Sequence, residues 1–352
     1  RGYMFSFLTR NKAILAGAAL AAVFANAGPA AAAFKQIRDS WVQCDFASNC
    51  TLALKSTDNG PISFSLYRSS AVNSQPSLRL SGFDQNAKAG KIAVAVDGKQ
   101  VISFDLSAMK LDDGQGYYEN AADVKKLLDA MKAGQKLTLQ YNGKTYSYSL
   151  SGFVGGLIYM DEQQSLNGTV AALQAKGNKA APPAPDVSQI TTINELPESI
   201  RKDFIGEDSV CGTDDGDPFQ NGGGCNAKIA DGTNLIGVPC GSPGAYNQPY
   251  TFYSQSDDKV VPISLPTISD DGPSTVDEAW NIDWSQSSRT LTAFFKGRGI
   301  GDCGTYDVWK ATDDVDGKVR FVLLEERSKG DCDGNYAGGP EKWPASWPVS
   351  KK

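Results

Sequence analysis

Seven cysteines constrain the fold of this chain more than any other feature, and all of them lie beyond residue 43. In an oxidising compartment such cysteines usually pair, and each bond limits how the chain can be routed. Cys44 and Cys50 are close enough in sequence to close a small hairpin loop, and Cys303 and Cys332 flank a strand-rich stretch near the C-terminus. We therefore expect the disulfides Cys44–Cys50 and Cys303–Cys332.

The other three cysteines, Cys211, Cys225 and Cys240, cannot all be paired among themselves. We expect Cys240 to bond either Cys211 or Cys225, which leaves one thiol over. A metal site is the alternative for such residues, but it requires CxxC-like spacing or histidine partners. The sequence has neither, so we expect disulfides here, and no metal or other cofactor.

The first 33 residues have the pattern of a secretory signal peptide. Arg10 and Lys12 supply positive charge before an apolar stretch over residues 13–24, and the alanines at 31–33 fit the small-residue rule for cleavage. The apolar stretch is too short to anchor a chain in a membrane, and no later segment approaches the roughly 20 apolar residues that a span requires. We expect cleavage before Phe34, export to the periplasm or the medium, and no span in the mature chain.

Composition excludes several classes of function. The formal charge of −6 becomes −9 once the signal segment is removed, with 31 basic against 40 acidic residues, and this disfavours nucleic-acid binding. The sequence has no histidine, which excludes Ser-His-Asp triads, Cys-His dyads and imidazole-ligated metals. Carboxylate-based or lysine-based catalysis is not excluded.

A proline- and alanine-rich stretch over residues 179–186 divides the rest of the chain. Such runs favour extended, semi-rigid conformations and resist packing into a core. A chain of 352 residues is long enough for two domains. We therefore expect one domain over residues 34–178 and a second, disulfide-stapled domain over residues 187–352, joined by a linker.

The first half is rich in strand signals. Asp97-Gly98 and Asn142-Gly143 each separate two strand-like runs, as is typical of two-residue hairpins. Residues 120–134 predict a capped helix, because four side chains fall on one apolar face: Val124, Leu127, Leu128 and Met131. Residues 169–176 predict a second, short helix. The first half is thus expected to be a β-sandwich with a helix covering one face.

The second half also predicts mostly strands. A short helix is expected over residues 196–204, with Pro197 in its first turn, and Asp316-Gly317 marks a turn between the last two strands. Neither half alternates strands with helices, which excludes a doubly wound fold. The predicted fold class is mainly β (α+β), with two β-rich, sandwich-like domains. The strands expected in the second half cover residues 235–238, 251–253, 290–295, 305–309 and 319–325.

Three strings in the sequence are distinctive: Trp41-Val-Gln-Cys44-Asp with Cys50, Pro239-Cys240 followed by Gly244-Ala-Tyr246-Asn247, and Lys296-Gly-Arg298-Gly-Ile-Gly-Asp302-Cys303-Gly followed by Trp309. Together they resemble the bacterial domain-of-unknown-function family 1176. The resemblance covers essentially the whole mature chain and implies a periplasmic or secreted protein of Gram-negative bacteria with no assigned activity. The first half more loosely resembles the invasion-associated locus B proteins, through its opening tryptophan–cysteine pair and Ser149-Leu-Ser-Gly152-Phe153.

The best candidate for a ligand site is the glycine-rich loop over residues 297–301. Its glycines leave backbone N–H groups uncovered around Arg298, and a bond at Cys303 would hold the loop rigid, so it could bind an anion. A dinucleotide fingerprint is excluded because a strand, and not a helix, is predicted to follow the glycines. The alternative is a clasp, in which Arg298 pairs with a nearby acid and fastens two loops. The candidate site comprises Arg298, Asp302, Tyr246, Asn247 and Trp309.

Other motifs carry less information. The acidic run Asp214–Asp217 lacks the spacing of an EF-hand, so a solvated loop is favoured over a calcium site. The pairs Trp280/Trp284 and Trp343/Trp347 could form a carbohydrate platform, although core packing is the commoner use of tryptophan. Forty acidic residues offer no specific pair for glycoside hydrolysis.

These observations favour an exported, non-catalytic binding protein of the bacterial envelope, whose partner is an envelope component or another protein. Two alternatives are a histidine-independent, carboxylate-based hydrolase and a secreted host-interaction factor. We assign no catalytic residue from the sequence.

Overall fold

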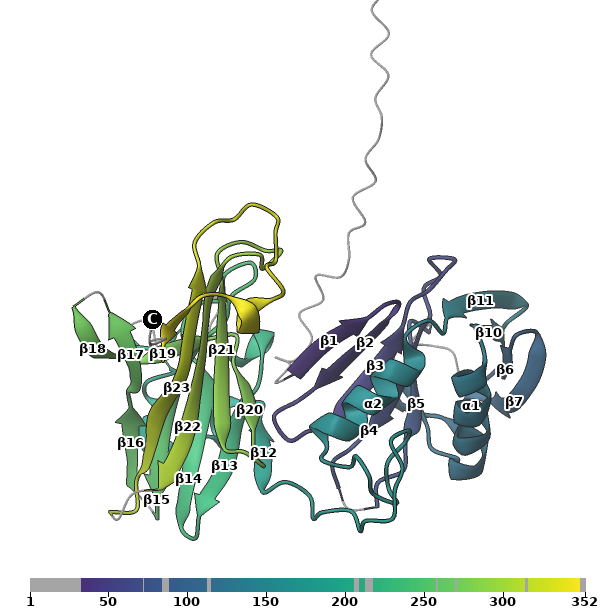
Figure 1. Cartoon of the computed structure of the whole chain (residues 1–352). Helices are drawn as coiled ribbons and strands as arrows, with labels where there is room; N and C mark the ends of the chain where they lie inside the picture. Colours follow the sequence, from purple (N-terminus) through teal and green to yellow (C-terminus); the bar gives the residue numbers. More distant parts are fainter. Residues whose placement is uncertain are drawn as a thin grey trace, which may run out of the picture.

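The computed structural model describes residues 33–348, apart from 72, 84–88, 113–114, 206–208, 213–217, 258, 270 and 314–315. Nearly all of the expected signal segment and the acidic run Asp214–Asp217 lie outside the described residues. The described chain consists mostly of antiparallel sheets, with few helices (Figure 1). The predicted fold class, mainly β, is confirmed. None of the described helices has the length and apolar character needed to cross a membrane.

Two antiparallel sheets make up the first half (Figure 1). The larger has the strand order β1-β2-β3-β4-β5-β9-β8, and the smaller has the order β11-β10-β6-β7. The strands are β1 (Ala33–Ile37), β2 (Ser40–Cys44), β3 (Cys50–Leu54), β4 (Ser63–Arg68), β5 (Ser77–Ser81), β6 (Lys91–Val96), β7 (Lys99–Asp105), β8 (Lys110–Asp112), β9 (Gln115–Tyr118), β10 (Lys136–Tyr141) and β11 (Lys144–Ser149), with a 3-10 turn at Leu106–Ala108.

Both predicted two-residue hairpins are present in the smaller sheet. Asp97 and Gly98 connect β6 to β7 with φ values of 48° and 81°, and Asn142 and Gly143 connect β10 to β11 with φ values of 50° and 72°. Two consecutive positive φ angles produce a turn whose twist matches that of the flanking strands, and Asp-Gly and Asn-Gly adopt it readily. The local sequence therefore determines where each of these two hairpins turns.

The predicted helix is α1 (Ala121–Ala133), which packs its apolar stripe into the core. Asn120 caps it by accepting the Asp123 N–H at 3.1 Å. Gly134 ends the helix with a φ of −95°, so a left-handed conformation is not the reason for glycine here. A Cβ at this position would lie 2.2 Å from Val96 Cγ1, and the close approach of β6 requires its absence.

A second helix, α2 (Phe153–Gln163), was not predicted from the sequence. It lacks a side-chain cap, since its N-cap is Gly152 with a φ of 90°, and it contains two glycines. The helix packs against β1, β2 and β3 (Figure 1). A Cβ on Gly156 would lie 2.5 Å from Leu52 Cδ1, so glycine allows the helix to approach the sheet closely. Its stability therefore comes from tertiary packing and not from local signals.

The short helix predicted over residues 169–176 is wrong, because this segment forms turns. The amides of Leu173, Gln174 and Ala175 donate to the carboxylate of Asp161 at 2.7, 2.8 and 3.1 Å. A buried carboxylate from another element thus replaces the carbonyl acceptors that a helix would have used. The sequence of the segment itself contains no sign of this partner.

The second half has two larger sheets and a hairpin (Figure 1). One sheet has the order β12-β13-β14-β15-β16, with β19 also paired to β15, and the other has the order β20-β21-β22-β23-β24. All five predicted strands are present. The predicted helix over residues 196–204 is shorter, and begins directly after Pro197 as α3 (Glu198–Arg201).

The strands of the second half are β12 (Val187–Ile190), β13 (Gly224–Ala230), β14 (Thr233–Pro239), β15 (Pro249–Ser256), β16 (Lys259–Ile263), β17 (Leu265–Ser269), β18 (Gly272–Val276), β19 (Glu278–Trp280), β20 (Asp283–Ser285), β21 (Thr290–Lys296), β22 (Gly304–Asp313), β23 (Val319–Lys329) and β24 (Ala345–Trp347), with 3-10 turns at Ile193–Glu195, Pro218–Asn221 and Pro340–Lys342.

Buried apolar side chains form separate clusters in the two halves. One cluster joins both sheets and both helices of the first half, and two others lie in the second half. Phe46 is the exception, because it belongs to the first half in sequence but is buried in a cluster of the second, with its ring 6.1 Å from that of Tyr250. The division at residues 179–186 stays a prediction, and any separation of the halves would expose Phe46.

Three disulfides cross-link the described chain. The expected bonds Cys44–Cys50 and Cys303–Cys332 are both present. Of the two partners left open for Cys240, the structure joins Cys211, and Cys225 is a buried free thiol. Burial raises the pKa of Cys225 to about 12, so this cysteine acts as a small apolar core residue and not as a nucleophile.

Candidate functional site

Arg298 follows β21, and its guanidinium already has a partner. Its Nε donates to Asp302 Oδ1 at 2.7 Å and its Nη2 donates to Asp302 Oδ2 at 2.5 Å. Asp302 is fully buried and also accepts the Gly334 N–H at 2.6 Å. The hydrogen bonds from Arg298 hold the pKa of Asp302 well below its usual range. This geometry is the clasp that the sequence offered as the alternative to a ligand site.

The other residues of that candidate site are divided between two places. Tyr246 Oη donates to Gly297 O at 3.5 Å, and Asn247 Nδ2 donates to Lys296 O at 2.9 Å, so both lie beside the Arg298 loop. Trp309 is buried in the core of the second half, where its Nε1 donates to Pro266 O at 2.6 Å. A ligand site at Arg298 stays a prediction, and Trp309 has a structural role of its own.

The tryptophan pairs do not form an exposed platform for a sugar. Trp284 and Trp343 are buried, and the Trp343 ring packs edge-on against Phe294 with centroids 5.7 Å apart. Trp280 packs in the same manner against Phe295, at 5.5 Å. Core packing therefore accounts for one member of each pair.

A groove of about 560 Å³ lies on the first half, where three segments meet. One wall is the serine-rich loop after β4, residues 69–76, and another is the exposed side of α1. The third consists of the turns that follow α2, with the proline-rich residues 181–185 beside them. The stretch expected to act only as a linker therefore forms part of a wall.

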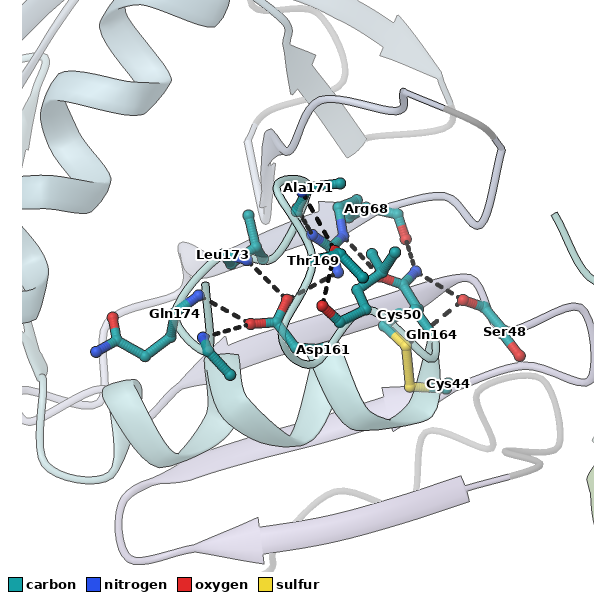
Figure 2. Close-up of polar contacts among 12 residues, drawn as sticks. Cys44, Ser48, Cys50, Arg68, Asp161, Gln164, Thr169, Ala171, Leu173 and Gln174 are labelled. Atoms are coloured by element: carbon teal, nitrogen blue, oxygen red, sulfur yellow. Dashed lines mark hydrogen bonds and ion pairs between the residues drawn. A yellow bond between two sulfur atoms is a disulfide. The ribbon is translucent and has the colours of Figure 1, made fainter. Parts of the chain in front are cut away.

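The base of the groove is a buried polar network around Arg68, the last residue of β4 (Figure 2). The guanidinium donates to Gln164 Oε1 at 2.6 Å, to Asp161 Oδ1 at 3.1 Å and to Ala171 O at 3.2 Å. Gln164 in turn donates to Ser48 O at 2.7 Å and to Arg68 O at 3.1 Å. The network thereby joins β4, the end of α2, the turns after it and the loop closed by Cys44–Cys50.

Arg68 and Asp161 are almost completely removed from solvent, with exposures of 2% and 0%. Burial lowers the pKa of Arg68, and the neighbouring carboxylate opposes that shift. Asp161 accepts three backbone N–H groups besides the guanidinium (Figure 2). A buried ion pair is tolerated when hydrogen bonds satisfy both partners in this way. The network is therefore a fixed support for the groove and not a reactive centre.

The network was not predicted from the sequence, although the two-residue spacing of buried residues in β4 and their four-residue spacing in α2 both point to it. Phe64, Leu66 and Arg68 follow one another at every second position of β4 and are all buried, so the arginine continues the inward face of the strand. Phe153, Leu157 and Asp161 follow at every fourth position of α2 and are also buried. Opposite charges on two inward faces indicate a buried pair. The signal was missed because α2 itself was not predicted.

Two carboxyl groups in the second half have unusual surroundings. Burial raises the pKa of Asp283, on β20, to about 7. Burial, followed by repulsion from Glu326, raises the pKa of Asp307 to about 7 as well. Asp307 and Glu326 are opposed on β22 and β23, and Glu326 accepts hydrogen bonds from Thr267, Ile268 and Ser346. This pair of neighbouring carboxyl groups is a candidate for the hydrolase alternative.

The free energy of unfolding is expected to fall as the pH rises from about 4 to 7, because Asp307 holds its proton more tightly in the folded chain than in the unfolded one. Replacing Asp307 by Asn should remove this contribution to the pH dependence of the free energy of unfolding. Urea unfolding at pH 5 and pH 8 should show the wild type losing roughly 2–3 kcal/mol relative to the variant between the two pH values. Equal pH dependence in both proteins would show that Asp307 titrates normally.

Comparison with known proteins identifies the family. The family model described as "Protein of unknown function (DUF1176)" matches residues 34–350. The uncharacterised protein YpfG of Escherichia coli K12 is 26% identical over 347 residues, which cover 91% of this chain and 93% of that protein. No solved structure matches the chain. These matches do not include the invasion-associated locus B proteins, and that resemblance stays a prediction. The chain belongs to the DUF1176 family.

Proposed function

We propose that the mature protein is exported and acts as a non-catalytic binding protein of the Gram-negative envelope, in the periplasm or after secretion. We place its ligand in the groove of the first half. Three disulfides support an oxidising compartment, since such bonds are rare in the bacterial cytosol. The resemblance of the N-terminal segment to a signal peptide supports the same location.

The observation that carries this proposal is the support beneath the groove. The Arg68 network ties the end of β4, where the serine-rich loop begins, to the end of α2 and the turns after it through hydrogen bonds. Lys132 of α1 also donates to Leu173 O at 2.7 Å, so the helix wall is held against the same turns before any ligand arrives. Preorganised walls with convergent polar groups are typical of binding sites.

The test is the mass of the protein as recovered from a bacterial periplasm. We expect native mass spectrometry of the wild type to show a bound small molecule that is lost under denaturing conditions. Ala122→Trp should abolish the added mass, because Ala122 is exposed on α1 and lines the groove. Ala133→Trp, on the same helix but away from the groove, is the matched control and should retain it. Bare wild-type protein, or equal retention by both variants, would contradict the proposal.

A carboxylate-based hydrolase is the second candidate, and the raised pKa of Asp307 beside Glu326 is the observation that favours it. It ranks lower because Glu326 is held by three hydrogen bonds within the fold. A ligand site at Arg298 ranks lower for a similar reason, because two donor groups of the guanidinium already form hydrogen bonds with Asp302.

A further inference from the structure

The charged residues that line the groove are mainly cations, although the chain as a whole is acidic. Its charged lining residues are Arg68, Lys125, Lys132 and Lys176, against a single acid, Asp129. The formal charge of the whole chain is −6, so this excess of positive charge is local. The charge of Arg68 is balanced by its ion pair with the buried Asp161. The remaining charged groups on the walls are three ammonium groups and one carboxylate.

The ammonium groups converge because of where their elements place them. Lys125, Asp129 and Lys132 are spaced four and three residues apart on α1, so they share one face of the helix. Lys125 Nζ lies 2.8 Å from Asp129 Oδ2, and Lys132 Nζ lies 3.8 Å from Asp129 Oδ1. The hydrogen bond from Lys125 lowers the pKa of Asp129. Lys176 faces them from the turns after α2 and makes no ion pair among the described residues.

The three lysines of the groove differ in how accessible they are to a ligand. Lys132 is 23% exposed and donates to Leu173 O at 2.7 Å, so it is held in place by the turn that the Arg68 network supports. Lys125 is 76% exposed, and Lys176 is exposed as well, so both can reach a ligand. Ala121 and Ala122 also bring the N-terminal turn of α1 to the groove, where Asp123 of the same turn offsets the positive potential of the first amides.

The neutral lining restricts the ligand further. Ser69, Ser70, Ser74, Asn73 and Gln75 present hydroxyl and amide groups, which bind oxygen atoms. None of the described lining residues is aromatic, so the groove has no platform on which a neutral sugar ring could stack. A volume of about 560 Å³ suits a small molecule and not a folded partner.

We propose that the groove binds a small molecule that carries two or more oxyanion groups, either carboxylates or phosphates. Lys125 and Lys176 contact these groups directly, while Lys132 completes the positive wall. This inference rests on the proposed function and names the class of ligand for the same groove. Each oxyanion accepts charge-assisted hydrogen bonds from the ammonium groups and neutral ones from the serine-rich loop.

The experiment uses the full mature chain, with citrate as the carboxylate probe, a sugar bisphosphate as the phosphate probe, and neutral glucose as the comparison. Calorimetry should show binding of at least one anion, weakening as salt is added, and none of glucose. The double variant Lys125→Gln/Lys176→Gln should weaken anion binding about tenfold or more. The control Lys99→Gln/Lys144→Gln removes the same charge from two exposed hairpin lysines outside the groove and should bind as the wild type does.

The two anion probes separate carboxylate from phosphate recognition, and either preference supports the proposal. Failure of both probes to bind, or an equal loss of affinity in the two double variants, overturns it. The experiments also distinguish a wrong class of ligand from a groove that binds no ligand at all. If Lys125→Gln/Lys176→Gln keeps a co-purified ligand that Ala122→Trp loses, the groove binds a ligand that is not an anion. If all variants lack a ligand, the proposed function fails too.

Discussion

Replacing Arg68 by Met is expected to lower the free energy of unfolding by about 3–5 kcal/mol. The variant keeps most of the side-chain volume but leaves the carboxylate of Asp161 buried without its cation. It also leaves Gln164 Oε1 and Ala171 O without the guanidinium donors that they have in the wild type. Urea unfolding followed by far-UV circular dichroism, with the disulfides intact, measures the effect.

The matched control for Arg68 is Lys55→Met, which breaks an ion pair of the same half at the surface. Lys55 lies 3.4 Å from Asp39, and the two side chains are 56% and 36% exposed. Exposed pairs contribute about 0–1 kcal/mol, so Lys55→Met should be close to neutral. If Arg68→Met were equally mild, the network would not support the groove, and the argument for preformed walls would lose its basis.

Phe46→Ala is expected to destabilise the second half of the protein by about 3–5 kcal/mol, although Phe46 belongs to the first half in sequence. Its side chain is 1% exposed and lies in a core cluster with Tyr250 and Phe252. Truncation would leave a cavity in that core, in addition to the lost apolar burial. Tryptophan fluorescence during urea unfolding reports on the second half, because five of the six tryptophans lie there.

Phe34→Ala serves as the comparison for Phe46, since Phe34 is 60% exposed on β1. This variant should change the free energy of unfolding by no more than about 0.5 kcal/mol. An unchanged fluorescence midpoint in Phe46→Ala would show that the halves are independent. A lowered midpoint would show that cleavage at residues 179–186 deprives the second half of a core residue.

The first disulfide accounts for the position of Phe46. Cys44–Cys50 closes the short loop that carries this side chain, and Asp45 stiffens it by accepting the Asn49 N–H and side-chain amide, both at 2.9 Å. A stiff loop loses less conformational entropy when it inserts a side chain into another core. The short spacing of the two cysteines predicted the bond but contained no sign of what the loop would contact.

The sequence predicted those helices, strands and turns that depend on interactions between residues close together in the chain. The Asp-Gly and Asn-Gly turns, the capped helix α1 and the strands of the second half follow from φ preferences, capping and periodicity. Helix α2 was missed because glycines interrupt it and packing on β1–β3 stabilises it. Residues 169–176 were assigned to a helix wrongly because their amides bond to Asp161, a partner outside the segment.

The two candidate sites also differ in how far the sequence predicted them. The residues near Arg298 were correctly expected to lie on a disulfide-pinned loop, and the chain brings Tyr246 and Asn247 to it. The groove was not foreseen, because its walls come from the loop after β4, from α1 and from the turns after α2, which are distant in sequence. A positive cluster of this kind is invisible in an acidic chain until the fold brings Lys125 and Lys176 together.

The central claim is that the groove of the first half is the ligand site, and a crystal structure of the mature protein grown with citrate or the sugar bisphosphate tests it most directly. We predict electron density for the anion between Lys125, Lys176 and the serine-rich loop, with the Arg68 network unchanged beneath it. Density beside Arg298 or Asp307, with the groove free of ligand, would contradict the account.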